Sequence, residues 1–445
     1  MSAVQESTRI NSHGEALVPT VAAAISLPIV LFSLMGYDIN PAFLLAPLIG
    51  MAFLKSFGRT TVAYMSAMTL GLVSIFVANT LLPDGELVRH ILSLVLIMFA
   101  PSFLFLGKYV SKKHGVDKAF YWLSVFSALF LIVVTVRIFM LDQAVRIYIG
   151  PLGLAAMNAE FFGLPVFASF GVLSLAHLIC LQAMVLCGAF IAGKASKPML
   201  ALFWIALFCA SFLIIGSDSR SAQVLLAWIL GTIVVYAWRH AGARRVCGVA
   251  ILAILMAFAV SYFRGISESR LVTSIEAFSG DEAPAVKEGK SAPKEWEKQA
   301  DQFATGRIEL IVAGLKEVSV SPVIGNGFGS YGRYGDSANE QSKGLKANSS
   351  THVYYLTLLW KGGVIFFIPF IAMILLNLRA AVIGTKATEG SAERFFAWAA
   401  VLMAFGPMAL AWDILIVPSA GALAFFLFGL LGGLKNRAAV IQAIT

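Results

Sequence analysis

Long apolar segments separated by short polar ones make up most of the chain, and charged residues are rare inside them. A helix that crosses a bilayer needs about 20 mostly apolar residues. Twelve segments come close enough to this length to predict membrane-spanning helices. They cover about 17–36, 40–57, 60–82, 89–108, 119–140, 164–193, 199–216, 221–238, 246–263, 352–378, 395–417 and 419–434. The pattern therefore predicts an all-α polytopic membrane protein with about 12 spans.

The basic residues alternate from loop to loop along the chain. With the N-terminus inside, the cytoplasmic loops and tails hold 17 lysines and arginines, whereas the short outer loops and outer helix ends hold 4. Short cytoplasmic loops of membrane proteins carry such an excess of positive charge. The distribution predicts twelve spans with both termini in the cytoplasm, because adding or removing one span would destroy the alternation.

The composition excludes a water-soluble protein. Of the 445 residues, 59% are hydrophobic and only 13% are charged, whereas soluble domains average about 25% charged residues. The net charge of +9 follows from the basic cytoplasmic loops and does not indicate a nucleic-acid partner. The four cysteines all lie in or beside apolar segments. We therefore expect buried free thiols and no disulfide framework.

A hydrophilic loop divides the chain into three parts. These are spans one to nine (1–263), a large periplasmic loop (264–351) and spans ten to twelve (352–445). Within the loop, apolar residues at helical spacing over 304–320 predict an amphipathic helix on the bundle or at the lipid interface, with Glu317 off the apolar stripe. A glycine-rich run follows it, so the loop is predicted to be partly helical.

Three ionisable residues at the ends of predicted helices are functional candidates, because charge near the membrane is costly. Arg220, in a Ser-Asp-Ser-Arg-Ser segment, offers a guanidinium fork suited to phosphate oxygens. His352 opens the tenth span, where the positive helix end favours the neutral imidazole that a general base needs. Arg307 begins the amphipathic helix. Each is also compatible with an interfacial or solvent-facing residue, but the topology puts all three on the outer face.

Further polar residues are weaker candidates. His90 and Arg146 lie on the same predicted face and would join the site, and Asp218 lies beside the first arginine. His177 lies in the middle of the sixth span, where we predict a hydrogen bond between packed helices. Asp413, near the outer end of the eleventh span, would pair with an arginine.

Several kinds of chemistry lack their residues. The sequence contains no G-x-x-x-x-G-K-S/T motif, no H-E-x-x-H motif and no cluster of cysteine and histidine, so we predict no metal site. Asp84 and Glu86 in an outer loop are an alternative source of a catalytic base. Lys361 lies about nine residues into the tenth span, where it must pair or reach the interface.

The order and spacing of these motifs resemble the O-antigen ligase and polymerase superfamily of bacterial envelope enzymes. The similarity extends from Ser219 to Ile368 and consists of Ser-Arg before a span, Thr-Gly-Arg before an amphipathic helix, the run Ser321–Gly329, and His352 opening the tenth span. The chain departs from the family in two places. Val353 follows His352 where the family often has asparagine, and Trp360-Lys361 stands where an acidic residue commonly precedes the glycines.

The resemblance implies a membrane glycosyltransferase of the GT-C type in the bacterial inner membrane, acting on the periplasmic face without metal or other cofactor. It would transfer a glycan from a polyprenyl-diphosphate carrier to a hydroxyl of lipid A–core, as a ligase, which is the interpretation we prefer. A polymerase would transfer it to another lipid-linked chain. His352 would be the base, and Arg220 and Arg307 the diphosphate ligands. A transporter without chemistry is the alternative, although the chain lacks the internal repeats typical of transporters.

Overall fold

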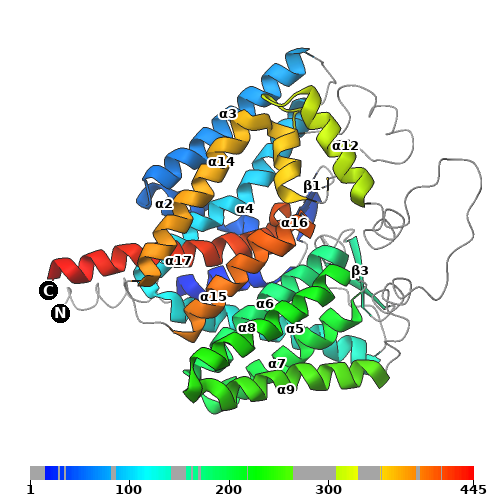
Figure 1. Ribbon diagram of the computed structural model, residues 1–445, viewed down its shortest axis with the longest axis vertical. Helices are drawn as coiled ribbons and strands as arrows, with labels where there is room; N and C mark the ends of the chain where they lie inside the picture. Colours follow the sequence, from blue (N-terminus) through cyan, green and yellow to red (C-terminus); the bar gives the residue numbers. More distant parts are fainter. Residues whose placement is uncertain are drawn as a thin grey trace, which may run out of the picture.

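Figure 1 presents the protein as a computed structural model. It describes residues 16–28, 31–34, 37–81, 87–141, 157–161, 164–168, 172–217, 219–263, 307–328, 351, 353–386, 391–411 and 413–444. The long helices are α3 (Arg59–Leu81), α4 (Leu87–His114), α5 (Val116–Leu141), α6 (Val172–Ala192), α7 (Lys197–Gly216), α8 (Arg220–Arg239), α9 (Arg244–Phe263), α14 (Tyr354–Lys386) and α17 (Pro418–Ile444).

The shorter elements connect or cover these helices. They are the helices α2 (Ala46–Lys55), α12 (Arg307–Val320), α15 (Ala392–Met403) and α16 (Ala409–Ala411), and the strands β1 (Phe32–Leu34), β2 (Tyr37–Ile39), β3 (Met157–Phe161) and β4 (Leu164–Ala168). The strands form two antiparallel hairpins, β1 with β2 and β3 with β4. In these hairpins Leu34 lies opposite Tyr37 and Phe161 lies opposite Leu164.

The helices agree with the predicted fold class. Among the described residues, nine helices are long and apolar enough to cross a membrane. Three shorter apolar helices, Ala16–Ser26, Pro41–Lys55 and Pro418–Leu434, lie where the first, second and twelfth spans are predicted. The all-α polytopic membrane fold is thus confirmed. The count of twelve spans, the three-part division and the orientation stay predictions.

The predicted start of the sixth span is wrong. The sequence pattern places that span over 164–193, but residues 164–168 form strand β4 and helix α6 begins only at Val172. A proline at position 165 explains part of the difference, because the residue before a proline is disfavoured in the helical region and extended backbone is preferred there. Hydrophobicity alone does not distinguish a short apolar strand from the start of an apolar helix.

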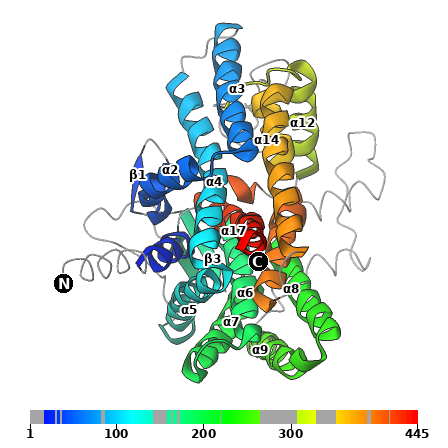
Figure 2. The same ribbon diagram turned by 90° about the vertical axis from the view of Figure 1, so that its left-hand side faces the viewer.

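Helix α17 forms the centre of the bundle, between α4 and α14 (Figures 1 and 2). Its backbone approaches that of α4 closely where Gly107 faces Gly429. A Cβ atom at Gly107 would clash with the carbonyl oxygen of Phe426, and one at Gly429 with that of Leu104. Membrane helices use such small residues to bring their backbones together, because packing replaces the hydrophobic driving force that water would supply.

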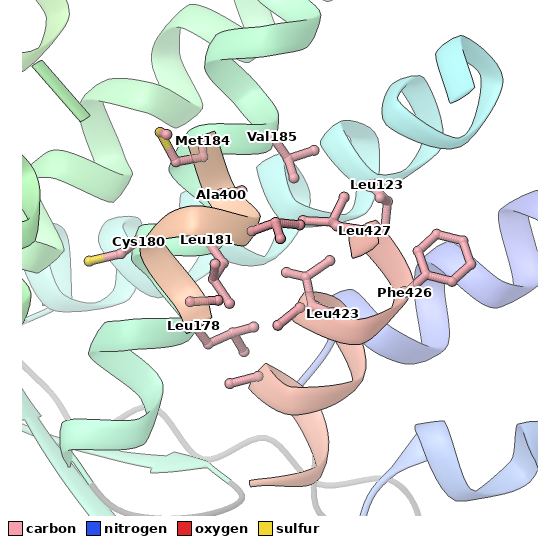
Figure 3. Packing of buried hydrophobic residues seen from close by; sticks show 14 of the residues in the cluster. Leu123, Leu178, Cys180, Leu181, Met184, Val185, Ala400, Leu423, Phe426 and Leu427 are labelled. Atoms are coloured by element: carbon pink, nitrogen blue, oxygen red, sulfur yellow. The ribbon is translucent and has the colours of Figure 1, made fainter. Parts of the chain in front are cut away.

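A dense apolar contact joins α17 to α6 and its neighbours. Figure 3 shows Leu178, Leu181 and Val185 of α6 facing Leu423 and Leu427 of α17. All five side chains are at most 1% exposed. Lipid tails are as apolar as leucine, so this contact stabilises the bundle mainly through close van der Waals packing. The four cysteines are also buried and free, as the sequence predicts.

An ion bridge holds the end of the bundle at which α15 begins. Lys194 Nζ lies 2.7 Å from Asp117 Oδ2 and 2.9 Å from Glu393 Oε1. Partial burial alone would lower the pKa of Lys194, but its hydrogen bonds to Asp117 and Glu393 outweigh that effect and raise the pKa. The Glu393 side chain is 4% exposed. The bridge therefore compensates a nearly buried carboxylate while connecting α5, α15 and the turn between α6 and α7.

The predicted amphipathic helix exists as α12, although its buried face differs from the expected one. Val312 and Leu315 of the predicted apolar stripe are 44% and 54% exposed. The fully buried positions are instead Gly314 and Glu317, on the side that packs against α14. The expectation that Glu317 points away from the bundle is therefore wrong, because this carboxylate has a hydrogen-bond partner in the chain that follows the helix.

Candidate functional site

Helix α14 is broken near its start. Gly363 has φ 62° and ψ −175°, a conformation that glycine adopts readily and other residues rarely adopt. The part before the break is a separate helix of about two turns, and the part after it is long enough to span a membrane by itself. Figure 1 shows the two parts of α14 meeting at an angle near α12. The predicted tenth span (352–378) therefore contains a break, and its helix continues to Lys386.

The segment that follows α12 fills this break. Four backbone hydrogen bonds of 2.9–3.1 Å join residues 322–327 to residues 360–365. The pairs, with the donor N–H first, are Asn326 with Trp360, Gly327 with Lys361, Val364 with Pro322, and Ile365 with Val323. Helix ends leave such carbonyl and N–H groups without partners inside the helix. The loop supplies those partners, so the interruption is tolerated within an apolar bundle.

Two glycines allow the loop and the broken helix to approach so closely. Gly325 has φ 77°, and a Cβ atom there would clash with the backbone nitrogen of Gly363. A Cβ atom at Gly363 would in turn clash with the carbonyl oxygen of Val323. The glycine-rich run is thus required by a backbone-to-backbone contact. We call residues 322–328 and 360–365 together the clamp.

Side chains reinforce the clamp from three directions. Lys361 Nζ donates a hydrogen bond to the carbonyl oxygen of Phe328 at 3.3 Å and lies 4.6 Å from the centre of the Trp360 ring. The Lys361 side chain is buried, and the prediction that this lysine must pair or reach the interface is confirmed through pairing. Asn326 Nδ2 donates to Glu317 Oε2 at 2.7 Å. Ser74 Oγ of α3 donates to the carbonyl oxygen of Ile324 at 2.5 Å.

A second polar cluster lies at the start of α14. Thr357 Oγ1 donates to Asp413 Oδ2 at 3.0 Å, and it lies 2.8 Å from Thr351 Oγ1 and 3.1 Å from the Thr351 backbone nitrogen. Thr351 and Thr357 are fully buried and Asp413 is 6% exposed. The Thr357 hydroxyl is one partner of Asp413, and the arginine partner expected for Asp413 stays a prediction. The cluster anchors the residue that immediately precedes His352.

Arg220 is the first residue of α8 and is half-buried. Ser219 caps this helix, because its Oγ accepts a hydrogen bond from the Ala222 backbone nitrogen at 3.3 Å. Ser221 Oγ lies 3.1 Å from His177 Nε2, which confirms the predicted packing hydrogen bond of that buried histidine. The positive end of a helix and a guanidinium both favour an anion at this place.

Contacts along α8 determine its direction relative to α15. Near the end of α8, the Tyr236 ring lies 5.6 Å from the Phe396 ring. Further toward its start, Trp228 Nε1 donates to the carbonyl oxygen of Ala399 at 3.3 Å. Residue numbers therefore fall along α8 as they rise along α15. The two helices run in opposite directions, and the start of α8 lies beyond the end of α15.

Helix α14 begins at the end of the bundle where α15 ends. Tyr355, in the first turn of α14, donates its hydroxyl hydrogen to the carbonyl oxygen of Phe405 at 2.6 Å, and Phe405 follows the end of α15. Arg220 lies two turns before Trp228, which is roughly 12 Å along the helix axis in that direction. The starts of α8 and α14 thus lie at a common end, which we call the loop end.

Helix α12 also approaches the start of α14. A Cβ atom at Gly314 would lie 2.5 Å from Thr351 Cγ2, which puts the middle of α12 directly against Thr351. Arg307 begins α12 two turns earlier, roughly 10 Å along the axis. The first residue of α12 therefore lies about 10 Å along the helix axis from the contact with Thr351.

The remaining predicted residues are only partly described. Outside the described residues lie His352, Asp218, Arg146 and the alternative acids Asp84 and Glu86. The side chain of Arg307 is outside them as well. His90 is described and is fully buried near the start of α4. The functional roles proposed for these residues stay predictions.

Sequence reasoning missed the hydrogen bond between Thr357 and Asp413 and the burial of Glu317. Threonines in apolar helices commonly bond to a carbonyl of their own helix, as Thr232 and Thr385 do here, so Thr357 gives no distinct signal. Asp413 does give one, because an acid between two apolar segments needs a partner. In the part of the chain that the structure describes, no three histidine, cysteine, aspartate or glutamate side chains gather as metal ligands would.

The comparison with known families supports the predicted resemblance. Residues 205–371 match the family model described as O-antigen ligase, which confirms the resemblance over this segment. The match includes α8, α12, the clamp and the positions of Arg220, Arg307 and His352. It supports a membrane protein of the glycan ligase or polymerase type. No curated protein matches the chain.

Proposed function

We propose that this chain is a membrane glycosyltransferase that transfers a glycan from a polyprenyl-diphosphate carrier to an acceptor hydroxyl, with lipid A–core as the preferred acceptor. The observation that carries the proposal is the O-antigen ligase match over residues 205–371. That segment contains Arg220, Arg307 and His352. The convergence of the starts of α8 and α14 at the loop end supports it further.

The proposed reaction needs one base and fixed positive charge. The acceptor oxygen attacks the anomeric carbon, and the bond from that carbon to the diphosphate oxygen breaks, with its electron pair leaving on the diphosphate. His352 takes the proton of the acceptor hydroxyl, which contributes about 10²–10⁴-fold to the rate. Arg220 and Arg307 bind the diphosphate oxygens and stabilise the charge that develops there. Transfer takes place at the loop end, on the periplasmic face, without a metal.

Three further polar residues have supporting roles in the proposal. His90, Arg146 and Asp218 lie on the same predicted face and would bind substrate or orient the arginines. A polymerase would use the same residues with a second lipid-linked glycan as the acceptor. The two activities differ in the shape of the acceptor cavity, so they are separated by the choice of acceptor in the assay.

The test uses purified protein in proteoliposomes with a defined polyprenyl-diphosphate oligosaccharide as donor. We expect wild-type protein to extend lipid A–core, and His352→Ala to lose about 10²–10⁴-fold in kcat. His240→Ala is the matched control, because His240 is exposed at the opposite end of α8. Normal transfer by His352→Ala would exclude the proposed base, and transport of the donor without any transfer would favour the transporter alternative.

A second arm tests the arginine at the start of α8. Arg220→Lys keeps the charge but loses the planar fork that binds two phosphate oxygens at once. We expect a loss of at least tenfold in kcat/KM for the diphosphate donor. Arg239→Lys is the control, because Arg239 is the last residue of the same helix. Equal activity of the two variants would remove Arg220 from the donor site.

A further inference from the structure

The strongest unexplained feature is the hydrogen-bonded chain Thr351–Thr357–Asp413, which belongs to three separate pieces of the fold. Asp413 follows α16, Thr357 lies in the first turns of α14, and Thr351 precedes that helix. The three are at most 6% exposed. Polar side chains buried in a membrane bundle are costly and are often functional.

The hydrogen positions in this chain follow from chemistry. A carboxylate only accepts hydrogen bonds, so the single hydroxyl hydrogen of Thr357 points to Asp413 Oδ2. The two lone pairs of Thr357 Oγ1 are then available to the Thr351 backbone N–H at 3.1 Å and the Thr351 hydroxyl at 2.8 Å. The Thr351 hydroxyl hydrogen has two acceptors within reach, Thr357 Oγ1 at 2.8 Å and the Val353 carbonyl oxygen at 3.0 Å. Thr357 therefore orients the Thr351 backbone through the N–H contact and lies within hydrogen-bond distance of its side chain.

Thr351 is fixed from its other side as well. Its Oγ1 accepts a hydrogen bond from the Val353 backbone nitrogen at 3.3 Å, which spans the position of His352. Its methyl group lies against Gly314 of α12, where a Cβ atom would be 2.5 Å away. Contacts from Thr357, from the Val353 backbone and from α12 thus restrict Thr351, the residue next to position 352.

We infer that Thr357, held by Asp413, is a positioning residue that fixes the backbone from which His352 reaches the acceptor hydroxyl. The inference rests on the proposed function, in which His352 is the base. A misplacement of about 1 Å in a catalytic group can cost about 10²-fold in rate. Thr357 would therefore affect the chemical step while leaving donor binding to the arginines.

The experiment compares variants in the proteoliposome transfer assay. Thr357→Val removes the Thr357 hydroxyl at nearly constant side-chain volume. Thr351→Val does the same at Thr351, its hydrogen-bond partner. We expect each to lower kcat about ten- to a hundredfold with donor KM changed less than about twofold. Thr357→Ser keeps the hydroxyl and should recover most of the lost rate. Thr232→Val is the control, because Thr232 is a buried threonine of α8 that bonds to its own helix at Trp228.

The outcomes separate this inference from the proposed function. If His352→Ala retains transfer, the proposed function itself is wrong. If His352→Ala is inactive while Thr357→Val and Thr351→Val turn over normally, the positioning role is overturned and the base stands. If Thr357→Val fails to fold, Thr351→Val decides the question. Unfolding of both variants would assign the cluster a structural role. A rise in donor KM without a change in kcat would assign it to donor binding. Either result overturns the inference.

Discussion

Replacing Gly363 by alanine should destabilise the protein strongly, because the clamp depends on that glycine. An L-residue at φ 62° and ψ −175° lies in a region that essentially only glycine adopts and is strained by about 1–3 kcal/mol. The new Cβ atom would also clash with the carbonyl oxygen of Val323, so at least one of the four clamp hydrogen bonds would be lost. Leaving a buried backbone group unsatisfied costs about 1–3 kcal/mol. The sum predicts a loss of about 2–6 kcal/mol in the free energy of unfolding.

The assay is equilibrium unfolding in mixed micelles, followed by circular dichroism. Gly231→Ala is the matched control, because Gly231 lies inside α8 with nothing within 4 Å of a Cβ atom. Alanine there should be neutral or should stabilise the helix by up to about 1 kcal/mol. If Gly363→Ala is as stable as the wild-type protein, the clamp does not hold the broken helix as described.

Three further variants test other contacts by the same unfolding measurement. Lys194→Met should cost about 1–2 kcal/mol, since Lys194 is 54% exposed but its partner Glu393 is nearly buried. Because its pKa is raised above the ordinary 10.5, this contribution should be constant from about pH 7 to 9 and disappear only as the pH rises through the raised pKa; a decline near neutral pH would contradict it. Asn326→Ala should cost about 1.5–3 kcal/mol through the lost hydrogen bond to Glu317, and no loss would show that this bond is dispensable. Gly107→Val should prevent the close approach of α4 and α17, and a folded, equally stable variant would refute that packing.

The helices are the part of the fold that sequence predicts best. Bilayer thickness fixes the length of an apolar segment, and the cost of burying charge keeps charged residues out of it, so most of α3 to α9 follows directly from hydrophobicity. The break in α14 does not, because the apolar pattern continues through Gly363. The two adjacent glycines at 362 and 363 are a visible signal, but only the position of the loop explains why the helix is interrupted there.

For the candidate site, the sequence predicts a side of the membrane but no contacts between residues. The alternation of basic loops assigns Arg220, Arg307 and His352 to one predicted face, but carries no information on their distances. The Thr357–Asp413 contact joins residues 56 positions apart, and such partners require the tertiary structure. Glu317 shows the converse problem, because helical periodicity assigns a glutamate to solvent unless its partner, here Asn326, is known.

The clamp also constrains how the protein is made. Residues 322–327 leave the ribosome before residues 360–365. Until those later residues have been synthesised, the backbone groups of the loop lack their clamp partners. The loop can form its hydrogen bonds to residues 360–365 only after α14 has been inserted into the membrane. The clamp therefore forms late in biogenesis. A nascent chain truncated before residue 360 would leave the glycine-rich segment accessible to protease. A nascent chain that extends beyond residue 365 would protect that segment.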